Sequence, residues 1–196
     1  MKKFVFILLL LVIFFIPFPV RAAVSVDIVD GSYITVGSPT VAMGAVQFSF
    51  ACQTTTGTLG TSSEQIYVDN RVLGALDCWD VSLAAANVGD LWTSGGNTYD
   101  FNDATGGGCT NGQMTVNANA GTLATGQCIG CSTNGVTKGV SAAFGETNSI
   151  TILSADASSD DIGDWTLQGV SISQKIPAEK PVGNYSISMV LSIVAK

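Results

Sequence analysis

Apolar and polar residues alternate one by one in several short stretches of the chain, and the clearest stretch lies near its end. Between positions 184 and 194, one face carries Tyr185, Ile187, Met189, Leu191 and Ile193. Serine takes most of the opposite face. A period of two is the pattern of a β-strand with one buried face. We therefore predict that this stretch is a strand that closes a β core.

The same criteria predict strands in most other parts of the chain, at 24–30, 33–36, 44–52, 66–71, 77–84, 113–117, 148–153 and 165–176. The stretch 44–52 is expected to be the strongest strand of the N-terminal half, with Val46, Phe48, Phe50 and Cys52 on a buried face. Residues 53–63 have no apolar period and are predicted to form a loop. The fold class is therefore all-β: a single antiparallel β-sandwich, or a partly closed barrel, with long loops rich in Gly, Thr and Ser.

The first 22 residues have a different pattern. Lys2 and Lys3 precede an apolar run at 4–16, and Val20-Arg21-Ala22 has the small residues of a cleavage site. The run is short for a membrane-spanning helix, so we predict a secretory signal peptide at 1–22, with an uncleaved anchor as the alternative. The β domain then covers 23–196, and its expected location is outside the cell.

The net charge of the chain limits the kinds of molecule that it is expected to bind. The chain has 8 basic and 15 acidic residues, a net charge of −7. Loss of Lys2, Lys3 and Arg21 with the signal peptide leaves five basic residues and a net charge of about −10. The remaining basic residues are scattered, so we expect no nucleic-acid partner.

Five cysteines in an exported chain predict two disulfides and one free thiol. Cys109, Cys128 and Cys131 lie in one glycine-rich region, and we expect Cys109 to pair with Cys128 or Cys131. Such a bridge closes a loop of about twenty residues and contributes roughly 3 kcal/mol. Zinc binding by the Cys128-x-x-Cys131 pair is less favoured, because the chain has no histidine and no second Cys-x-x-Cys. Redox use is less favoured because the glycine-rich surroundings lack the strand-to-helix context of a thioredoxin-like site.

The sequence offers little for catalysis or for metal binding. Without histidine, a Ser-His-Asp or Cys-His device is impossible, and no paired carboxylates are evident. Acidic residues gather at Asp156, Asp160, Asp161 and Asp164, but the glycine and glutamate of a calcium loop are missing. We predict a solvated acidic loop, no metal, no cofactor and no enzyme activity.

Two parts of the chain resemble WxL domains, the surface domains of Gram-positive bacteria. Gly183-Asn184-Tyr185 and the alternating run after it are similar to the closing motif of that family, with Leu191 in place of its tryptophan. Val68-Asp69-Asn70-Arg71 and Trp79-Asp80-Val81-Ser82-Leu83 are similar to an earlier pair of motifs, with Cys78 in place of a glycine. The resemblance implies an exported all-β domain that associates noncovalently with cell-wall peptidoglycan.

Four aromatic residues are the candidates for ligand binding: Trp79, Trp92, Trp165 and Tyr185. They are expected either to stack on sugar rings or to anchor strands in the core, and the alternation around Trp79 favours a core position. Trp92 lies among glycines, where it either forms a binding platform or pins a loop.

Two functions follow from these expectations. The first is a secreted surface protein that binds the cell wall. The alternative is a structural subunit of a surface layer or fibre that assembles with other surface proteins by β-strand addition. Residues 24–36 discriminate between them, because a segment that is donated to a neighbour should be loosely tied to its own sheet.

Overall fold

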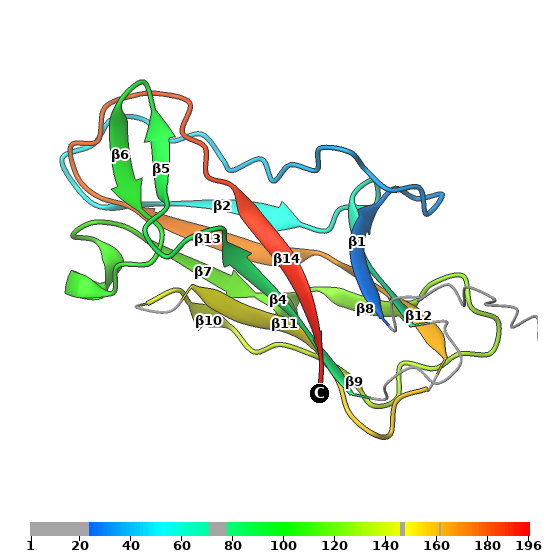
Figure 1. The fold of residues 1–196 in the computed structure, drawn as a ribbon. Coiled ribbons are helices and arrows are strands. Elements are labelled where there is room, and N and C mark those ends of the chain that lie inside the picture. The colour runs from blue at the N-terminus through cyan, green and yellow to red at the C-terminus, as the bar shows by residue number, and fades with distance from the viewer. Residues whose placement is uncertain (1–23, 71–77, 146–147, 161) are drawn as a thin grey trace, which may run out of the picture.

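The computed structural model describes residues 24–70, 78–145, 148–160 and 162–196, and these residues form an all-β molecule (Figure 1). The predicted signal peptide at 1–22, Arg71 and Asp161 lie outside the described residues. Besides strands, the described chain has two short 3-10 turns, at Thr105–Gly108 and Ala118–Ala120.

The strands form three antiparallel four-stranded sheets and one hairpin within the described residues. The first sheet has the order β1 (Ser25–Val29), β3 (Gln65–Asn70), β12 (Gly163–Gln168), β8 (Thr122–Thr125). The second has the order β10 (Ala142–Ala143), β7 (Gln113–Asn117), β13 (Val170–Ile176), β2 (Gln53–Leu59). The third has the order β14 (Met189–Ala195), β4 (Trp79–Ala85), β11 (Ser149–Ala155), β9 (Val136–Lys138). The hairpin is β5 (Leu91–Ser94) and β6 (Asn97–Asp100).

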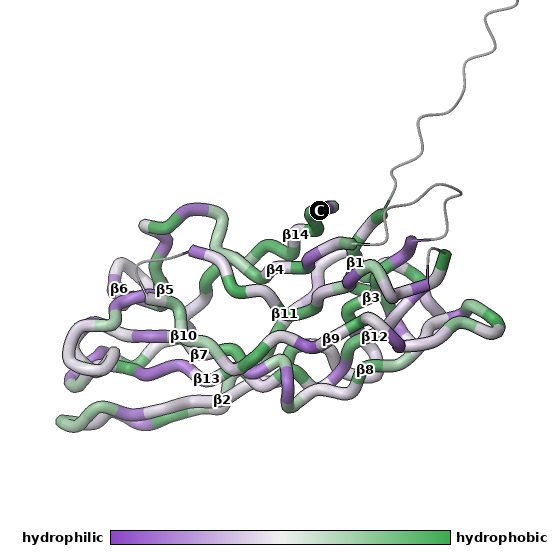
Figure 2. The backbone as a smooth tube through the Cα atoms, turned by 90° about the horizontal axis from the view of Figure 1, so that it is seen from below, coloured by the Kyte–Doolittle hydropathy of each residue, from purple (hydrophilic) through white to green (hydrophobic). Residues whose placement is uncertain are grey.

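The first two sheets follow one another along a single layer. Only Gly169 separates β12 from β13, and their neighbours β3 and β2 are likewise consecutive in the chain. Gly169 has φ +77°, a conformation that favours glycine, and its N–H donates to the Gly60 carbonyl. The third sheet crosses this layer, so that β2 and β13 lie on one side of the molecule and β4 and β14 on the other (Figure 2). The described strands thus form a β-sandwich of open sheets and not a closed barrel.

Apolar side chains from both layers meet in the interior. Trp79 of β4 and Trp165 of β12 are both fully buried, with ring centroids 5.5 Å apart. The alternating face of β4 contributes Val81 and Leu83 beside Trp79. Removal of this much aromatic and aliphatic surface from water is the main source of stability in such a fold.

Most predicted strands are confirmed over their described residues: those at 24–30, 66–70, 78–84, 113–117, 148–153 and 165–176 correspond to β1, β3, β4, β7, β11 and the pair β12 and β13. Arg71 and Asp77, the ends of two of these predictions, lie outside the described residues. The final strand begins at Met189 and not at 184, although the predicted face from Tyr185 to Ile193 does pack against the core. The stretch 33–36 forms only an isolated bridge, between Val29 and Thr35. The sequence pattern missed the short strands β5, β6, β8, β9 and β10.

Two predictions in the N-terminal half were wrong. The stretch 44–52 is not a strand, and its expected buried face is exposed at Phe48 (49%) and Phe50 (80%). Residues 53–59, predicted as loop, are instead β2, which pairs with β13 along its whole length. The threonines of β2 are β-branched and suit a strand, although they give no apolar alternation. Because β2 occupies the place beside β13, the preceding segment runs outside the sheet.

Candidate functional site

Three aromatic rings form a column at the end of the molecule where the β5–β6 hairpin lies. Trp92 of β5 stacks on Tyr99 of β6 with centroids 5.9 Å apart, and Tyr99 contacts Tyr185 at 4.9 Å. Trp92 and Tyr99 are buried, and Tyr185 is half-buried. The structure therefore brings together two of the four predicted ligand-binding residues, Trp92 and Tyr185.

A buried amide holds this column in place. Gln174 of β13 is fully buried, and its Oε1 accepts a hydrogen bond from Trp92 Nε1 at 2.8 Å. Its Nε2 donates to the carbonyls of Asp100 and Lys175, at 3.0 and 2.8 Å. All the polar atoms of this side chain thus have partners, as a buried amide requires. The network fixes the hairpin and the orientation of the Trp92 ring.

The segment that carries Tyr185 is tied to the hairpin and to the chain on its other side. Thr93 and Ser186 exchange two backbone hydrogen bonds, of 2.9 and 3.0 Å. The Tyr185 hydroxyl donates to the Pro181 carbonyl at 3.0 Å, and the Glu179 N–H donates to the Ser49 carbonyl at 2.8 Å. These contacts hold the segment 177–185 opposite the segment 46–49.

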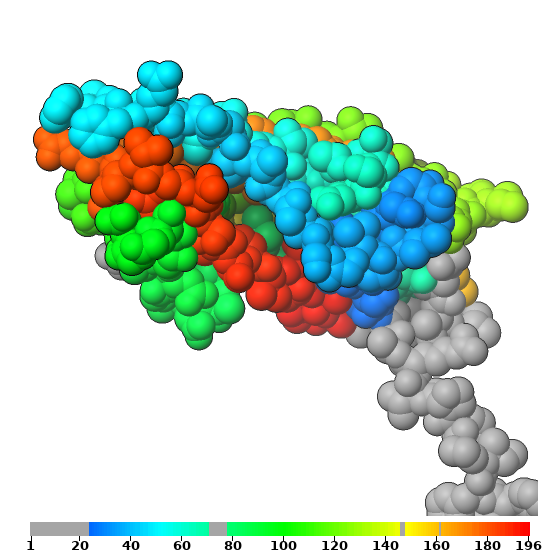
Figure 3. Space-filling view, turned by 90° about the horizontal axis from the view of Figure 1, so that it is seen from above, coloured from blue at the N-terminus to red at the C-terminus, as the bar shows by residue number. Residues whose placement is uncertain are grey.

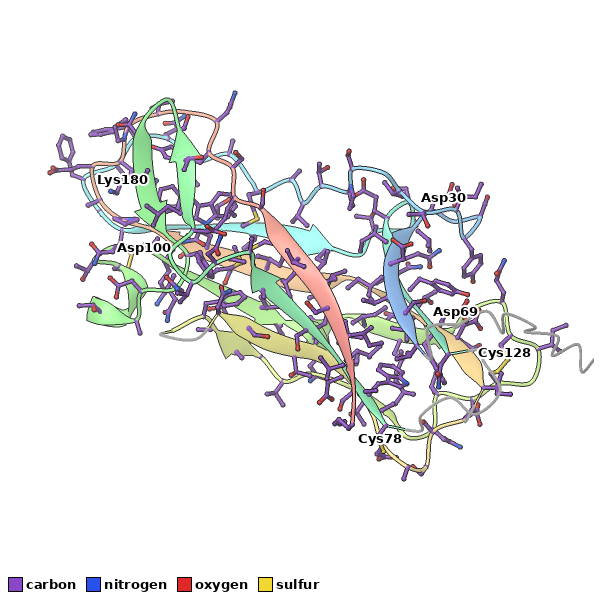
Figure 4. All side chains as sticks on the ribbon, viewed as in Figure 1. Asp30, Asp69, Cys78, Asp100, Cys128 and Lys180 are labelled. Carbon is purple, nitrogen blue, oxygen red and sulfur yellow. A yellow bond between two sulfur atoms is a disulfide. The ribbon has the colours of Figure 1, made fainter. Side chains whose placement is uncertain are left out.

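A cleft of about 70 Å³ lies between these two segments. Phe48, Tyr99 and Tyr185 supply aromatic surface, and Gln47 and Gln53 supply amides. Lys180 also lines it and donates to the Thr98 carbonyl at 3.0 Å, which places its amine beside the hairpin (Figure 4). The volume is that of about two water molecules, so a larger ligand would rest across the cleft and not inside it.

Exposed apolar surface surrounds the cleft. Phe48 and Phe50 pack edge to face at 5.2 Å and are exposed, as is Val182 on the opposite rim (79%). Aromatic rings that are held in place yet open to solvent can stack on a flat apolar ligand face. Sequence reasoning missed Phe48 because it assigned this residue to a buried strand, and no local motif marks Gln47, Gln53 or Lys180.

Ionisation at the cleft is shifted by burial. Burial, reinforced by the neighbouring Tyr185 hydroxyl, raises the pKa of Tyr99 to about 12. Burial and the Asp103 carboxylate raise the pKa of Asp100, whereas Lys180 lowers it. Tyr99 is therefore a neutral hydroxyl at physiological pH.

The other two predicted ligand-binding residues lie elsewhere. Trp79 and Trp165 are fully buried in the core, and the Trp165 Nε1 donates to the Ser132 carbonyl at 2.9 Å. Their ring faces are covered by protein, so they cannot stack on a sugar in this conformation. Of the two roles considered for them, the structure favours that of core anchors.

Comparison with known proteins does not assign the chain to a family. No family model matches the chain, and neither curated proteins nor solved structures include a significant match. The functional argument therefore rests on the geometry of the site.

The cysteines pair differently from the prediction. Cys52 bonds to Cys109 and Cys128 bonds to Cys131, which leaves Cys78 as the free thiol (Figure 4). The expected number of bridges is confirmed, but the pairing of Cys109 with Cys128 or Cys131 was wrong. The physical reason is that β2 places Cys52 at the end of the sheet beside the turn that carries Cys109, with Cα atoms 5.5 Å apart.

Carboxylates of the acidic loop hold backbone N–H groups. Asp156 accepts from Ser158, and Asp160 accepts from the Ser132 N–H. Asp164 accepts from the Tyr67 hydroxyl at 2.6 Å and from the Cys128 N–H at 2.8 Å. Among the described residues no group of three potential metal-binding side chains is found.

In the part of the chain that the structure describes, no helix has the length and apolar character to cross a membrane.

Proposed function

We propose that this chain is a secreted bacterial surface protein that associates noncovalently with the cell wall, and that the cleft binds the glycan of peptidoglycan. The observation that carries the proposal is the exposed Phe48 ring beside Tyr185, with amides and an amine within the same cleft. Sugar rings present apolar C–H faces and hydroxyl rims. Aromatic faces and amide side chains complement these two features.

The side chains of the cleft are held in place before any ligand binds. Gln174 fixes Trp92, and the contacts of Tyr185 with Tyr99 and Pro181 fix the cleft wall. A preformed site loses less conformational entropy on binding than a flexible one. Lys180 adds a positive charge that can pair with the carboxylates of wall peptides, in a chain that is otherwise acidic.

Two further observations agree with an exported, self-contained module. Two disulfides are typical of proteins outside the cytoplasm. The segment proposed to discriminate the two functions is paired internally, because β1 pairs with β3 at all five of its residues. This pairing argues against donation of residues 24–36 to a neighbour. The WxL resemblance supports the same proposal.

Titration of soluble peptidoglycan fragments, followed by the amide chemical shifts of the processed protein, tests the assignment of the cleft. We expect the largest shifts at residues 47–49, 98–99 and 180–185, and weaker binding for Phe48→Ser. Ile129→Ser is the matched control, since Ile129 is fully exposed on the Cys128–Cys131 loop. Shifts confined to other surfaces would overturn the assignment.

A further inference from the structure

The outer edge of β14 is the most open strand edge that the structure describes. The strand has seven residues, and each of them pairs with β4. On the opposite side of β14, no pairing is present within the described residues. Figure 1 shows β14 as the outermost strand of its sheet. Its outward backbone N–H and C=O groups are therefore available to another strand.

Other edge strands are short or covered by the chain itself. Strands β8, β9 and β10 have four, three and two residues. The outer side of β1 is covered by the segment 34–36, where the Val36 N–H donates to the Ile28 carbonyl at 2.8 Å. The edge of β2 is covered by residues 41–44, where the Gly44 N–H donates to the Thr56 carbonyl at 2.8 Å.

The residues of β14 add to this openness. Val190 and Val194 are exposed (44% and 62%), and the core-facing residues of the strand are only half-buried. The strand contains no charge, no proline and no interruption of register with β4. Natural edge strands usually carry at least one of these features, because each prevents unwanted pairing. The first charged residue after the strand is Lys196, whose Nζ lies 2.9 Å from the Asp80 carboxylate.

We propose that β14 pairs in antiparallel orientation with β14 of a second copy of this chain, across a two-fold axis at Ser192. In this register Val190 faces Val194 of the second copy, Leu191 faces Ile193, and Ser192 faces itself. Each apolar residue thus meets an apolar partner on the same face of the sheet. Lys196 lies opposite Ser188 of the second copy, so no like charges face each other.

The second copy is favoured over a different partner because the edge is complementary to itself. An antiparallel two-fold interface needs a strand whose two halves match, and β14 is apolar and neutral on both sides of Ser192. Pairing joins the two four-stranded sheets into one continuous sheet. Viewed from above, the surface is recessed between one part of β14 (red) and the segment that covers β2 (light blue), and β1 (blue) lies beside the rest of the strand (Figure 3).

The mass of the processed, exported protein in solution tests this proposal. Light scattering after gel filtration should give a mass that rises towards twice that of the monomer as concentration increases. Ser192→Lys places like charges opposite each other at the axis and should give a monomer of unchanged circular dichroism. Thr151→Lys, on an exposed position of β11 in the same sheet, is the matched control and should keep the dimer.

A cross-link identifies the register. Ser192→Cys in a Cys78→Ser background should form an intermolecular disulfide on mild oxidation, because residues that face each other across antiparallel strands have Cα atoms about 5 Å apart. A protein that is monomeric at all concentrations, a Ser192→Lys dimer or a failure to cross-link would overturn the proposal. Glycan binding at the cleft does not depend on this edge. The proposed function is therefore tested separately, whatever the result for the dimer.

Discussion

Tyr99 is the residue on which the candidate site depends. It lies between Trp92 and Tyr185, and it lines the cleft with one part of its ring while the rest is buried. The buried Gln174 holds the Trp92 ring by a hydrogen bond, and Tyr99 stacks on that ring. At this scale the site is an ordered aromatic column that ends at an open cleft.

The shifted pKa of Tyr99 predicts a specific loss of stability at high pH. Its pKa is about 12 in the folded protein and about 10 in the unfolded chain, so the unfolded chain loses its proton first as pH rises. The free energy of unfolding should therefore be unaffected below pH ~10 and fall between pH ~10 and ~12. Because solvent screens part of the effect on this partly exposed hydroxyl, the loss should be at most about 2 kcal/mol. Urea denaturation across this range measures it.

Tyr99→Phe is the control for this prediction, because it keeps the ring and removes the ionisable hydroxyl. The variant should show a flatter decrease in unfolding free energy across the same pH range. An identical decrease in both proteins would contradict a role for Tyr99 in the alkaline loss of stability.

Single residues show what a sequence pattern can and cannot predict. The alternation around Trp79 correctly favoured a core position, because β4 is a central strand with layers on its inner face. The same pattern at Phe48 led to a wrong prediction. A period of two says which residues share a face, but it does not say whether another layer covers that face.

At the scale of elements, the structure of the N-terminal half depends on which of two segments, 44–52 or β2, pairs with β13. The threonine-rich β2 took the place beside β13 because it can pair with that strand over seven residues. Apolar alternation identifies strands that contribute to a core, whereas β2 is held mainly by its hydrogen-bond ladder. The displaced segment then became one wall of the cleft.

The two disulfides should differ in their contribution to stability. Cys52 and Cys109 are 57 residues apart, whereas Cys128 and Cys131 are 3 apart. Loop entropy predicts a loss of about 4 kcal/mol for Cys52→Ser with Cys109→Ser, and about 2 kcal/mol for Cys128→Ser with Cys131→Ser. Denaturant titration of both double variants measures the difference. A larger loss from the shorter bridge would contradict this ranking.

For the whole molecule, the sandwich could be predicted and the cleft could not. Several amphipathic strands without helices leave few ways to bury their apolar faces, so the fold class follows from the pattern. The cleft joins segments near residues 47, 99 and 180, which are brought together by strand order and by Gln174. Trp92 and Tyr185 were identified from their type, but their partners needed the three-dimensional arrangement.

Association with the cell wall is the central claim, and sedimentation of the processed protein with purified peptidoglycan sacculi tests it most directly. We expect saturable binding by the native protein and at least a several-fold loss for Phe48→Ser, whose side chain is half exposed and can be removed without opening the core. Ile129→Ser should bind like the native protein. Absence of saturable binding, or equal binding by a folded Phe48→Ser variant, would contradict the account.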